Sequence, residues 1–228
     1  MPAPIRGEMI EAVIFDMGGV LAQDVWEHMY LDPEHGLAAR FGLDTTEINK
    51  VGLLLWDSYA HVPETNSNSW RELELRYWRQ FLSFFGDRIP QSVRDCGPQY
   101  LVQETDRFIV PIAGMPAELH RLRAQGLSMA ICSDNNEFWI RRQMDKCDLH
   151  RFFGPDKLVL SCRVGVSKSS PRFEMFHAAR EALRTPASRC LFIDDRQGNV
   201  ERAKAFGMEA ILFVSADDLG VELRSRGL

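Results

Sequence analysis

Five short runs of consecutive apolar residues constrain the fold of this chain more than any other feature of its sequence. They occupy residues 12–15, 129–132, 158–160, 191–193 and 210–214. Continuous apolar runs are typical of strands that are covered on both faces in a parallel sheet. Segments with apolar residues at helical spacing precede or separate the last four runs, at 116–125, 138–147, 171–183 and 200–206. This alternation predicts a doubly wound, Rossmann-like α/β fold with a parallel sheet.

A long segment interrupts the alternation, because more than a hundred residues separate the first run from the second. Two capping boxes in this segment predict helix starts, one formed by Asp44 with Glu47 and one by Ser69 with Glu72. The second predicted helix carries an aromatic stripe made of Trp70, Tyr77, Trp78, Phe81 and Phe85. Such a stripe can line a substrate pocket, but it is more often the core of a helical bundle. We therefore predict an α-helical cap domain at residues 24–106, with a polar loop at 65–68, inserted into a core domain made of residues 1–23 and 107–228.

Composition and charge exclude several classes of protein. The chain has 228 residues, with 27 Lys and Arg against 32 Asp and Glu, and its net charge of -5 argues against a broad nucleic-acid-binding surface. Its five cysteines are scattered without a C-x-x-C pair, which favours reduced thiols over disulfides or a zinc site. No apolar stretch approaches the ~18 residues of a membrane span, and residues 1–7 lack the apolar region of a signal peptide. We therefore expect a cytoplasmic monomer or homodimer that binds neither membranes nor nucleic acid.

Polar and charged residues follow the apolar runs where ligands bind in parallel sheets, just beyond the carboxyl ends of the strands. These residues are Asp16, Gly18 and Gly19 after the first run, Ser133 and Asp134 after the second, Lys168 downstream of the third, and Asp194 and Asp195 after the fourth. Each alone has an ordinary explanation as a turn, a helix cap or a solvated surface charge. Four such groups, each at its own strand, are much harder to obtain by chance. Together they predict that carboxylates, a hydroxyl and an ammonium group meet at one edge of the sheet.

This ordered set resembles the haloacid dehalogenase-like (HAD) hydrolase superfamily. Residues 13–21, with the sequence VIFDMGGVL, are similar to its first motif, and residues 131–134, ICSD, to its second. Lys168 and the downstream Pro-Arg-Phe are similar to the third motif, and residues 192–196, FIDDR, with Asn199 to the fourth. The resemblance covers the whole predicted core. An insertion between the first two motifs implies the helical cap of the first subclass of the superfamily.

The resemblance implies a magnesium-dependent phosphatase that acts on a small phosphorylated metabolite, such as a sugar phosphate. Asp16 would be the nucleophile, attacking the phosphoryl group and forming an aspartyl-phosphate that water hydrolyses. Because hard oxygen ligands suit Mg²⁺, the implied metal ligands are Asp16, the carbonyl of Gly18, and Asp194 or Asp195. The implied catalytic residues are Asp16, Ser133 and Lys168, and the implied phosphate-binding residues are Gly18, Gly19, Ser133, Asp134 and Lys168.

Two departures from the family pattern affect these expectations. Most phosphatases of the superfamily have a general acid, an aspartate two residues after the nucleophile, but Gly18 stands there. A missing general acid typically costs about 10²–10⁴-fold in rate, so we expect good leaving groups, such as those of aryl or anomeric sugar phosphates, to be favoured over primary alcohols. Asp24 or Asp134 could serve as the acid instead. In addition, Ser169 follows Lys168 where the family often has proline.

Two alternative functions remain open. Dehalogenases of the superfamily also lack the second aspartate and need no metal, but their fourth motif is typically rich in serine where this chain has Asp194 and Asp195. Adjacent carboxylates repel unless a cation lies among them, which favours magnesium and phosphate. The second alternative is a catalytically weak protein that uses the fold for binding or regulation, and Gly18 is its main support.

Overall fold

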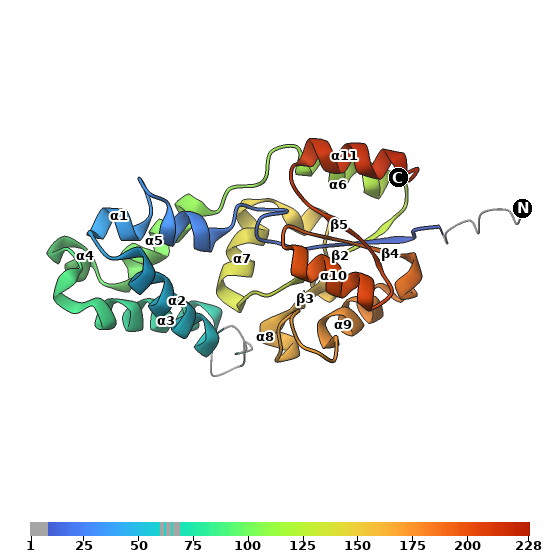
Figure 1. The fold of residues 1–228 in the computed structure, drawn as a ribbon. Helices are drawn as coiled ribbons and strands as arrows, with labels where there is room; N and C mark the ends of the chain where they lie inside the picture. The colour runs from blue at the N-terminus through green and yellow to red at the C-terminus, as the bar shows by residue number, and fades with distance from the viewer. Residues whose placement is uncertain (1–8, 60–61, 63–64, 66–68) are drawn as a thin grey trace, which may run out of the picture.

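The computed structural model describes residues 9–59, 62, 65 and 69–228. The first eight residues of the predicted core, and residues 66–68 of the predicted polar loop, lie outside the described residues. Within the described part, five parallel strands form one sheet in the order β3-β2-β1-β4-β5 (Figure 1). The strands are β1 (Ala12–Phe15), β2 (Ser128–Ser133), β3 (Leu158–Leu160), β4 (Cys190–Asp194) and β5 (Glu209–Leu212). Each predicted run contributes to a strand, and the doubly wound parallel sheet is confirmed.

Helices cover the sheet on both faces. On β1, Val13 and Phe15 belong to one buried apolar cluster, whereas Ala12 and Ile14 belong to a second. The helices of the α/β part are α6 (Met115–Ala124), α7 (Glu137–Lys146), α8 (Ser161–Val164), α9 (Glu174–Leu183), α10 (Gln197–Ala205) and α11 (Ala216–Ser225). Residues of α6, α7 and α11 pack into the first cluster, and those of α9 and α10 into the second (Figure 1). Because side chains on both faces of the strand are buried, its apolar run is continuous.

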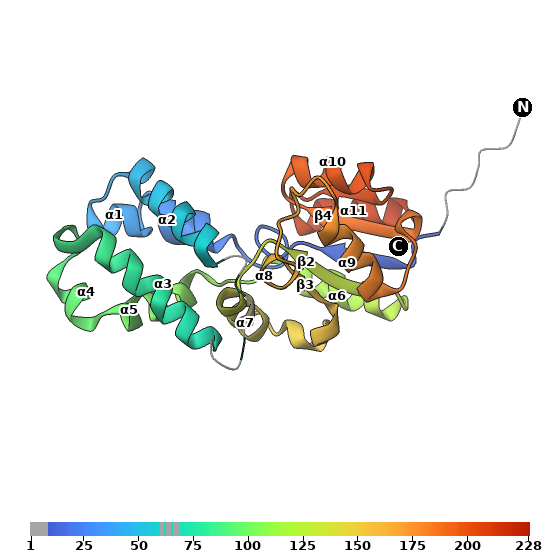
Figure 2. The same cartoon turned by 90° about the horizontal axis from the view of Figure 1, so that it is seen from below.

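The segment between β1 and α6 forms a helical insertion that lies beyond one end of the sheet, with α7 at the junction (Figure 2). Its helices are α1 (Leu37–Phe41), α2 (Thr45–Tyr59), α3 (Trp70–Phe85), α4 (Gln91–Cys96) and α5 (Pro98–Phe108). The described residues include no helix with the length and apolar character needed to cross a membrane. The insertion agrees with the expected helical cap, and the domain boundaries at residues 23/24 and 106/107 stay a prediction.

Both predicted capping boxes begin helices of the insertion. The N–H of Glu47 donates to Asp44 Oδ1 at 2.8 Å before α2, and the N–H of Glu72 donates to Ser69 Oγ at 3.3 Å before α3. The aromatic stripe on α3 is core: its members other than Trp70 are buried, and Trp70 packs against the same cluster. The bundle-core interpretation of this stripe is therefore confirmed.

Two chain segments connect the insertion to the sheet, and they run side by side. The N–H of Gln23 donates to the carbonyl of Val110 at 2.8 Å, and the N–H of Ile112 donates to the carbonyl of Leu21 at 3.1 Å. The first segment continues directly from the residues that follow β1. The residues after β1 are therefore held between the sheet and the helical insertion.

Candidate active site

The carboxyl ends of β1, β2 and β4 bring the first, second and fourth groups of predicted residues together. Phe15 pairs with Ile131 on one side and with Ile193 on the other, so the residues that follow these strands are neighbours. The N–H of Asp16 donates to the carbonyl of Ile193 at 2.9 Å. The chain changes its direction of winding here, because β4 pairs with β1 and not with β3. Such switch points are where open α/β sheets bind ligands.

Lys168 reaches this edge from the loop between α8 and α9. Its Nζ lies 2.8 Å from Asp16 Oδ2 and 2.6 Å from Asp194 Oδ2, and its side chain is only 1% exposed. Burial alone would lower the pKa of Lys168, but the charges of Asp16, Asp194 and other neighbours outweigh it and raise the pKa. The ammonium group therefore stays charged. Despite the serine that follows it, Lys168 meets the predicted carboxylates.

The loop that carries Lys168 is held on both sides of the residue. The backbone N–H of Lys168 donates to Asp134 Oδ1 at 2.8 Å, and the backbone carbonyl of Lys168 accepts from Arg202 Nε at 2.8 Å. Burial is the main cause that raises the pKa of the Asp134 carboxyl group. Asp134 thus positions the lysine backbone while it lines the pocket described below.

Asp194 is fully buried and its oxygens have several protein partners. Besides Lys168, the Nδ2 of Asn199 lies 3.0 Å from both carboxylate oxygens, and the N–H of Arg196 donates to Oδ1 at 2.9 Å. Burial raises the pKa of Asp194, which the lysine opposes. This carboxylate is satisfied within the protein.

Asp195 differs from Asp194 in its surroundings. Its Oδ1 is buried and accepts no hydrogen bond from the described residues. Burial, followed by the charges of Asp16 and Asp194, raises the pKa of Asp195 to about 6. One oxygen from each of these three carboxylates can be chosen so that all lie within 4.8 Å of one another. The site therefore contains an acidic cluster with one buried oxygen that lacks a partner.

Glycine is required at position 19 and not at position 18. Gly19 has a φ of +74°, and a Cβ atom there would lie 2.6 Å from Asp195 Cγ. Gly18 lines the pocket, and the atoms nearest to a Cβ at this position belong to Asp24, at 3.8 Å or more. Gly19 therefore lets the chain approach Asp195 closely, whereas a Cβ atom at position 18 would meet only ordinary contacts.

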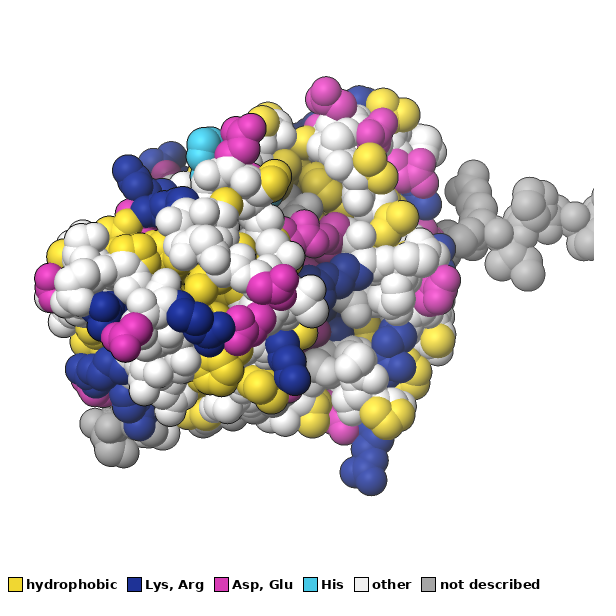
Figure 3. All heavy atoms as spheres, turned by 60° about the vertical axis from the view of Figure 1, so that its left-hand side comes forward, with side chains coloured by type: hydrophobic (Ala, Val, Ile, Leu, Met, Phe, Trp, Pro, Cys, Tyr) yellow, Lys and Arg dark blue, Asp and Glu magenta, His cyan; other side chains and the backbone are white. Residues whose placement is uncertain are grey.

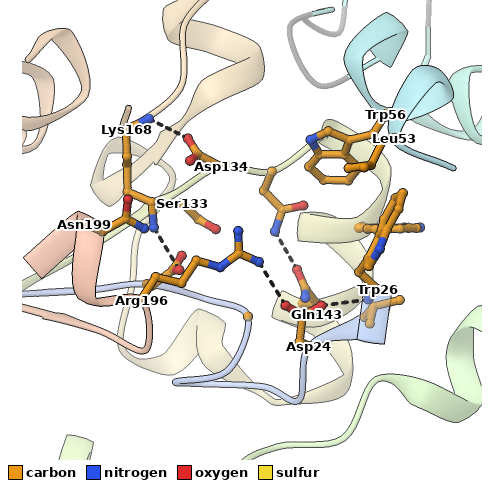
Figure 4. A pocket seen from close by; sticks show the side chains of 15 residues that line it. Asp24, Trp26, Leu53, Trp56, Ser133, Asp134, Gln143, Lys168, Arg196 and Asn199 are labelled. Atoms are coloured by element: carbon orange, nitrogen blue, oxygen red, sulfur yellow. Dashed lines mark hydrogen bonds and ion pairs between the residues drawn. The ribbon is translucent and has the colours of Figure 1, made fainter. Parts of the chain in front are cut away.

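A pocket of about 200 Å³ opens above this edge, between the sheet and the helical insertion. Its lining consists of Asp16, Gly18, Asp24, Val25, Trp26, Leu53, Trp56, Ser133, Asp134, Asn135, Trp139, Gln143, Lys168, Arg196 and Asn199. Figure 3 shows acidic and basic side chains gathered in the hollow between the two parts of the molecule. Lys168, Ser133 and Asn199 lie at one end of the pocket, and Trp26, Leu53 and Trp56 at the other (Figure 4). The pocket therefore has a polar end and a second end, called the apolar end below, where these three side chains lie beside Asp24 and Gln143 (Figure 4).

Most of the predicted site residues line this pocket or its acidic cluster. Asp16, Gly18, Ser133, Asp134 and Lys168 line the pocket, and Asp194 and Asp195 complete the cluster with Asp16. Gly19 is not part of the lining and packs against Asp195 instead. The predicted polar residues from four distant stretches are thus together in space.

The apolar end of the pocket was not predicted from the sequence. Trp26, Leu53, Trp56 and Trp139 line it, whereas the predicted alternative was the stripe on α3. Gln143 also lines the pocket and was missed. The sequence pattern gave little indication of this lining, because apolar residues on an amphipathic helix show the same spacing whether they face a core or a pocket.

A model of the haloacid dehalogenase-like hydrolase family matches residues 10–207. Phosphatase MT3486 of Mycobacterium tuberculosis (strain CDC 1551 / Oshkosh) is 27% identical over 213 residues, covering 89% of this chain and 87% of that protein. A HAD family enzyme of Bacteroides thetaiotaomicron, in complex with magnesium and inorganic phosphate, has a TM-score of 0.58 at 17% identity, covering 90% of this chain and 95% of that one. The L-2-haloacid dehalogenase of Xanthobacter autotrophicus has a TM-score of 0.54 at 20% identity, covering 95% and 83%. The two solved structures establish a shared fold.

Proposed function

Because this chain belongs to the haloacid dehalogenase-like hydrolases, we propose that it is a magnesium-dependent phosphatase that hydrolyses a small phosphomonoester through an aspartyl-phosphate at Asp16. The observation that carries this proposal is the carboxylate cluster of Asp16, Asp194 and Asp195, in which one buried oxygen accepts no hydrogen bond from the described residues. The similarity to a mycobacterial phosphatase supports it. Small sugar phosphates are among the substrates that the proposal includes.

The residues present fit a divalent cation. Three carboxylates this close repel one another, which is part of the reason why the pKa of Asp195 is raised to about 6. We assign Asp16, Asp195 and the carbonyl of Gly18 as the magnesium ligands, since Asp195 Oδ1 otherwise stays unsatisfied. Asp194 instead holds Lys168 and Asn199. An enzyme of the same fold has been solved in complex with magnesium and inorganic phosphate, which supports a magnesium site in this chain. When bound, magnesium supplies positive charge that offsets the repulsion between the nucleophile and the phosphate.

The chain supplies a nucleophile, Asp16, whose two carboxylate oxygens contact different partners. The N–H of Met17 donates to Asp16 Oδ1 at 2.7 Å, and Lys168 Nζ contacts Oδ2. In the first step a carboxylate oxygen bonds to phosphorus while the ester P–O bond breaks, and the electron pair leaves with the alcohol oxygen. Water then hydrolyses the acyl phosphate, which regenerates Asp16 and releases inorganic phosphate. Lys168 neutralises charge on the phosphoryl oxygens, and the Ser133 hydroxyl donates to one of them.

Hydrolysis of p-nitrophenyl phosphate with and without Mg²⁺ tests the proposal. We expect turnover that a chelator abolishes and that Asp16→Asn lowers by at least about 10³-fold, while the protein stays folded. Asp217→Asn is the matched control, because Asp217 is exposed at the start of α11. A fully active Asp16→Asn variant would overturn the mechanism.

The same assays decide between the alternatives. Halide release from a 2-haloacid that resists the chelator would identify a dehalogenase, which the fold similarity to such an enzyme leaves open. No turnover of aryl phosphates by a folded, magnesium-loaded sample would favour a binding or regulatory protein. The buried Asp195 oxygen favours the phosphatase, because a metal-independent dehalogenase would bury this carboxylate oxygen without a cation to offset the cost.

A further inference from the structure

The pocket that holds the proposed catalytic groups ends in an aromatic wall, formed by Trp26, Trp56 and Trp139 with Leu53. We infer that this wall recognises a flat, apolar leaving group, so that the preferred substrates are aryl phosphomonoesters and Trp56 is a specificity-determining residue. The inference rests on the proposed phosphatase function and names the substrate class of the same site.

The rings of the aromatic wall support one another. Trp26 stacks on Tyr30 with centroids 4.7 Å apart, and Trp56 meets Trp26 edge to face at 6.2 Å. Trp56 also contacts Trp139 of α7, with centroids 5.1 Å apart. The wall therefore combines residues from the segment after β1, from α2 and from α7. Offset and edge-to-face arrangements of this kind are favourable beyond the area that they bury.

Two features hold the Trp26 indole in place. Its Nε1 donates to Asn49 Oδ1 at 2.9 Å. A Cβ atom on Gly52 would lie 2.6 Å from Trp26 Cη2, so only glycine lets α2 approach this ring. A glycine inside a helix costs about 1 kcal/mol relative to alanine. Gly52 therefore makes α2 less stable than alanine would, at the place where α2 packs against the aromatic wall.

The wall presents apolar surface that is still open to solvent. Leu53 is 48% exposed although it lines the pocket, and Trp56 is partly exposed. A ring that enters the pocket would remove this surface from water, which favours binding. A small polar leaving group would leave this apolar surface exposed to water.

The charges of the pocket disfavour a leaving group that carries a second anionic group. Among the described lining residues, the cations are Lys168 and Arg196, and both already contact carboxylates. Lys168 contacts Asp16, and Arg196 lies 3.4 Å from Asp24 Oδ2. A second phosphate or carboxylate at the apolar end would therefore have to compete with these carboxylates for the two cations of the described lining.

An aryl leaving group also fits the chemistry at Gly18. A glycine cannot protonate the departing oxygen, and a phenolate leaves more readily without a proton than an alkoxide does. The shape of the pocket and the absence of an acid at position 18 therefore favour the same class of ester.

Binding of unreactive phosphonates to the magnesium-loaded protein tests the inference without requiring turnover. We expect calorimetry to show benzylphosphonate binding at least about tenfold more tightly than methylphosphonate. Phosphonoacetate, which carries a second anion, is expected to bind no better than methylphosphonate. Trp56→Ala should remove most of the preference for the benzyl group, and Trp56→Phe should retain it. In turnover of aryl phosphates, Trp56→Ala should raise KM far more than it lowers kcat.

Leu53 and Leu54 provide a matched pair of variants on α2. Both are exposed, but only Leu53 lines the pocket, so Leu53→Ala should weaken benzylphosphonate binding while Leu54→Ala should not. Equal affinity for the benzyl and methyl compounds would overturn the inference and leave the phosphatase proposal intact. If neither phosphonate binds, both proposals fail together.

Discussion

The carboxylate of Asp24 lies beside Gly18, with its Oδ2 3.8 Å from the position that a Cβ atom on residue 18 would take. Asp24 therefore lies next to position 18, where most phosphatases of the family have their general acid. Its Oδ1 accepts from the N–H groups of Trp26 at 2.8 Å and Glu27 at 3.3 Å, and its Oδ2 faces Arg196. A carboxylate that already accepts from these donors is poorly arranged to donate a proton.

Restoring a carboxyl group at position 18 should change the choice of leaving group. A Cβ atom at position 18 meets only ordinary van der Waals contacts, so the backbone there should accept Gly18→Asp. The nearby Asp24 carboxylate would favour the protonated form of the new side chain. We expect the rate for primary alkyl phosphates to rise about 10–100-fold relative to aryl phosphates. Rates measured across a series of leaving-group pKa values check this.

The adjacent glycine provides the control for that variant. Gly19→Ala would place a Cβ atom 2.6 Å from Asp195 Cγ, so it should disturb the acidic cluster and lower activity toward every ester alike. If the folded Gly18→Asp protein keeps the wild-type ratio of alkyl to aryl rates, residue 18 does not determine leaving-group preference.

Asp134 is the better of the two candidate substitute acids. Burial raises the pKa of Asp134, and the residue lines the pocket, whereas the oxygens of Asp24 are engaged as acceptors. Asp134→Asn keeps an oxygen for the N–H of Lys168 and should slow poor leaving groups about tenfold more than good ones. Asp24→Asn should slow both classes equally. The opposite pattern in the same series would assign the proton to Asp24.

Magnesium binding should depend on Asp195 more directly than on Asp194. In wild-type protein, Mg²⁺ at about 100 times its dissociation constant should raise the free energy of unfolding by about 2.7 kcal/mol. Asp195→Asn should remove most of this gain, because it replaces the carboxylate whose buried oxygen has no partner among the residues that the structure describes. Thermal unfolding with and without the ion measures the effect.

The same experiment on Asp194 should give a different result. Asp194→Asn weakens the contact to the buried Lys168, so the metal-free protein should lose about 1–3 kcal/mol of stability. Metal-free Asp195→Asn should lose none, since Asp195 is repelled by its neighbours. Equal loss of stability in both metal-free variants would contradict this division of roles.

A buried ion pair joins the helical insertion to the α/β part. Arg142 of α7 donates to both oxygens of Glu74 on α3 at 2.8–3.0 Å, and the Glu74 side chain is only 1% exposed. Arg142→Met would leave a buried carboxylate without its main partner, which should cost about 3–5 kcal/mol in urea unfolding. The neighbouring Arg141 is 46% exposed, so Arg141→Met should cost less than about 0.5 kcal/mol. Similar costs for both variants would show that the pair does not stabilise the junction.

Local sequence patterns were enough to predict the sheet, two helix starts and the polar end of the pocket. The strand at residues 12–15 is readable because both of its faces are buried, and the start of α3 because Ser69 caps it locally. Residues that follow parallel strands meet at one edge of the sheet, so the pattern alone predicts that Asp16, Ser133 and the pair after β4 lie together.

Differences between residues of the same type became visible only once distant parts of the chain were packed together. Asp194 and Asp195 are adjacent and identical in type. Within the described part of the chain, Lys168 and Asn199 contact Asp194, whereas one oxygen of Asp195 has no partner. In the same way, Trp56 faces the pocket while Trp78 is buried in the core. The physical reason is that local periodicity specifies which face of an element is apolar, whereas the neighbours of that face come from distant parts of the chain.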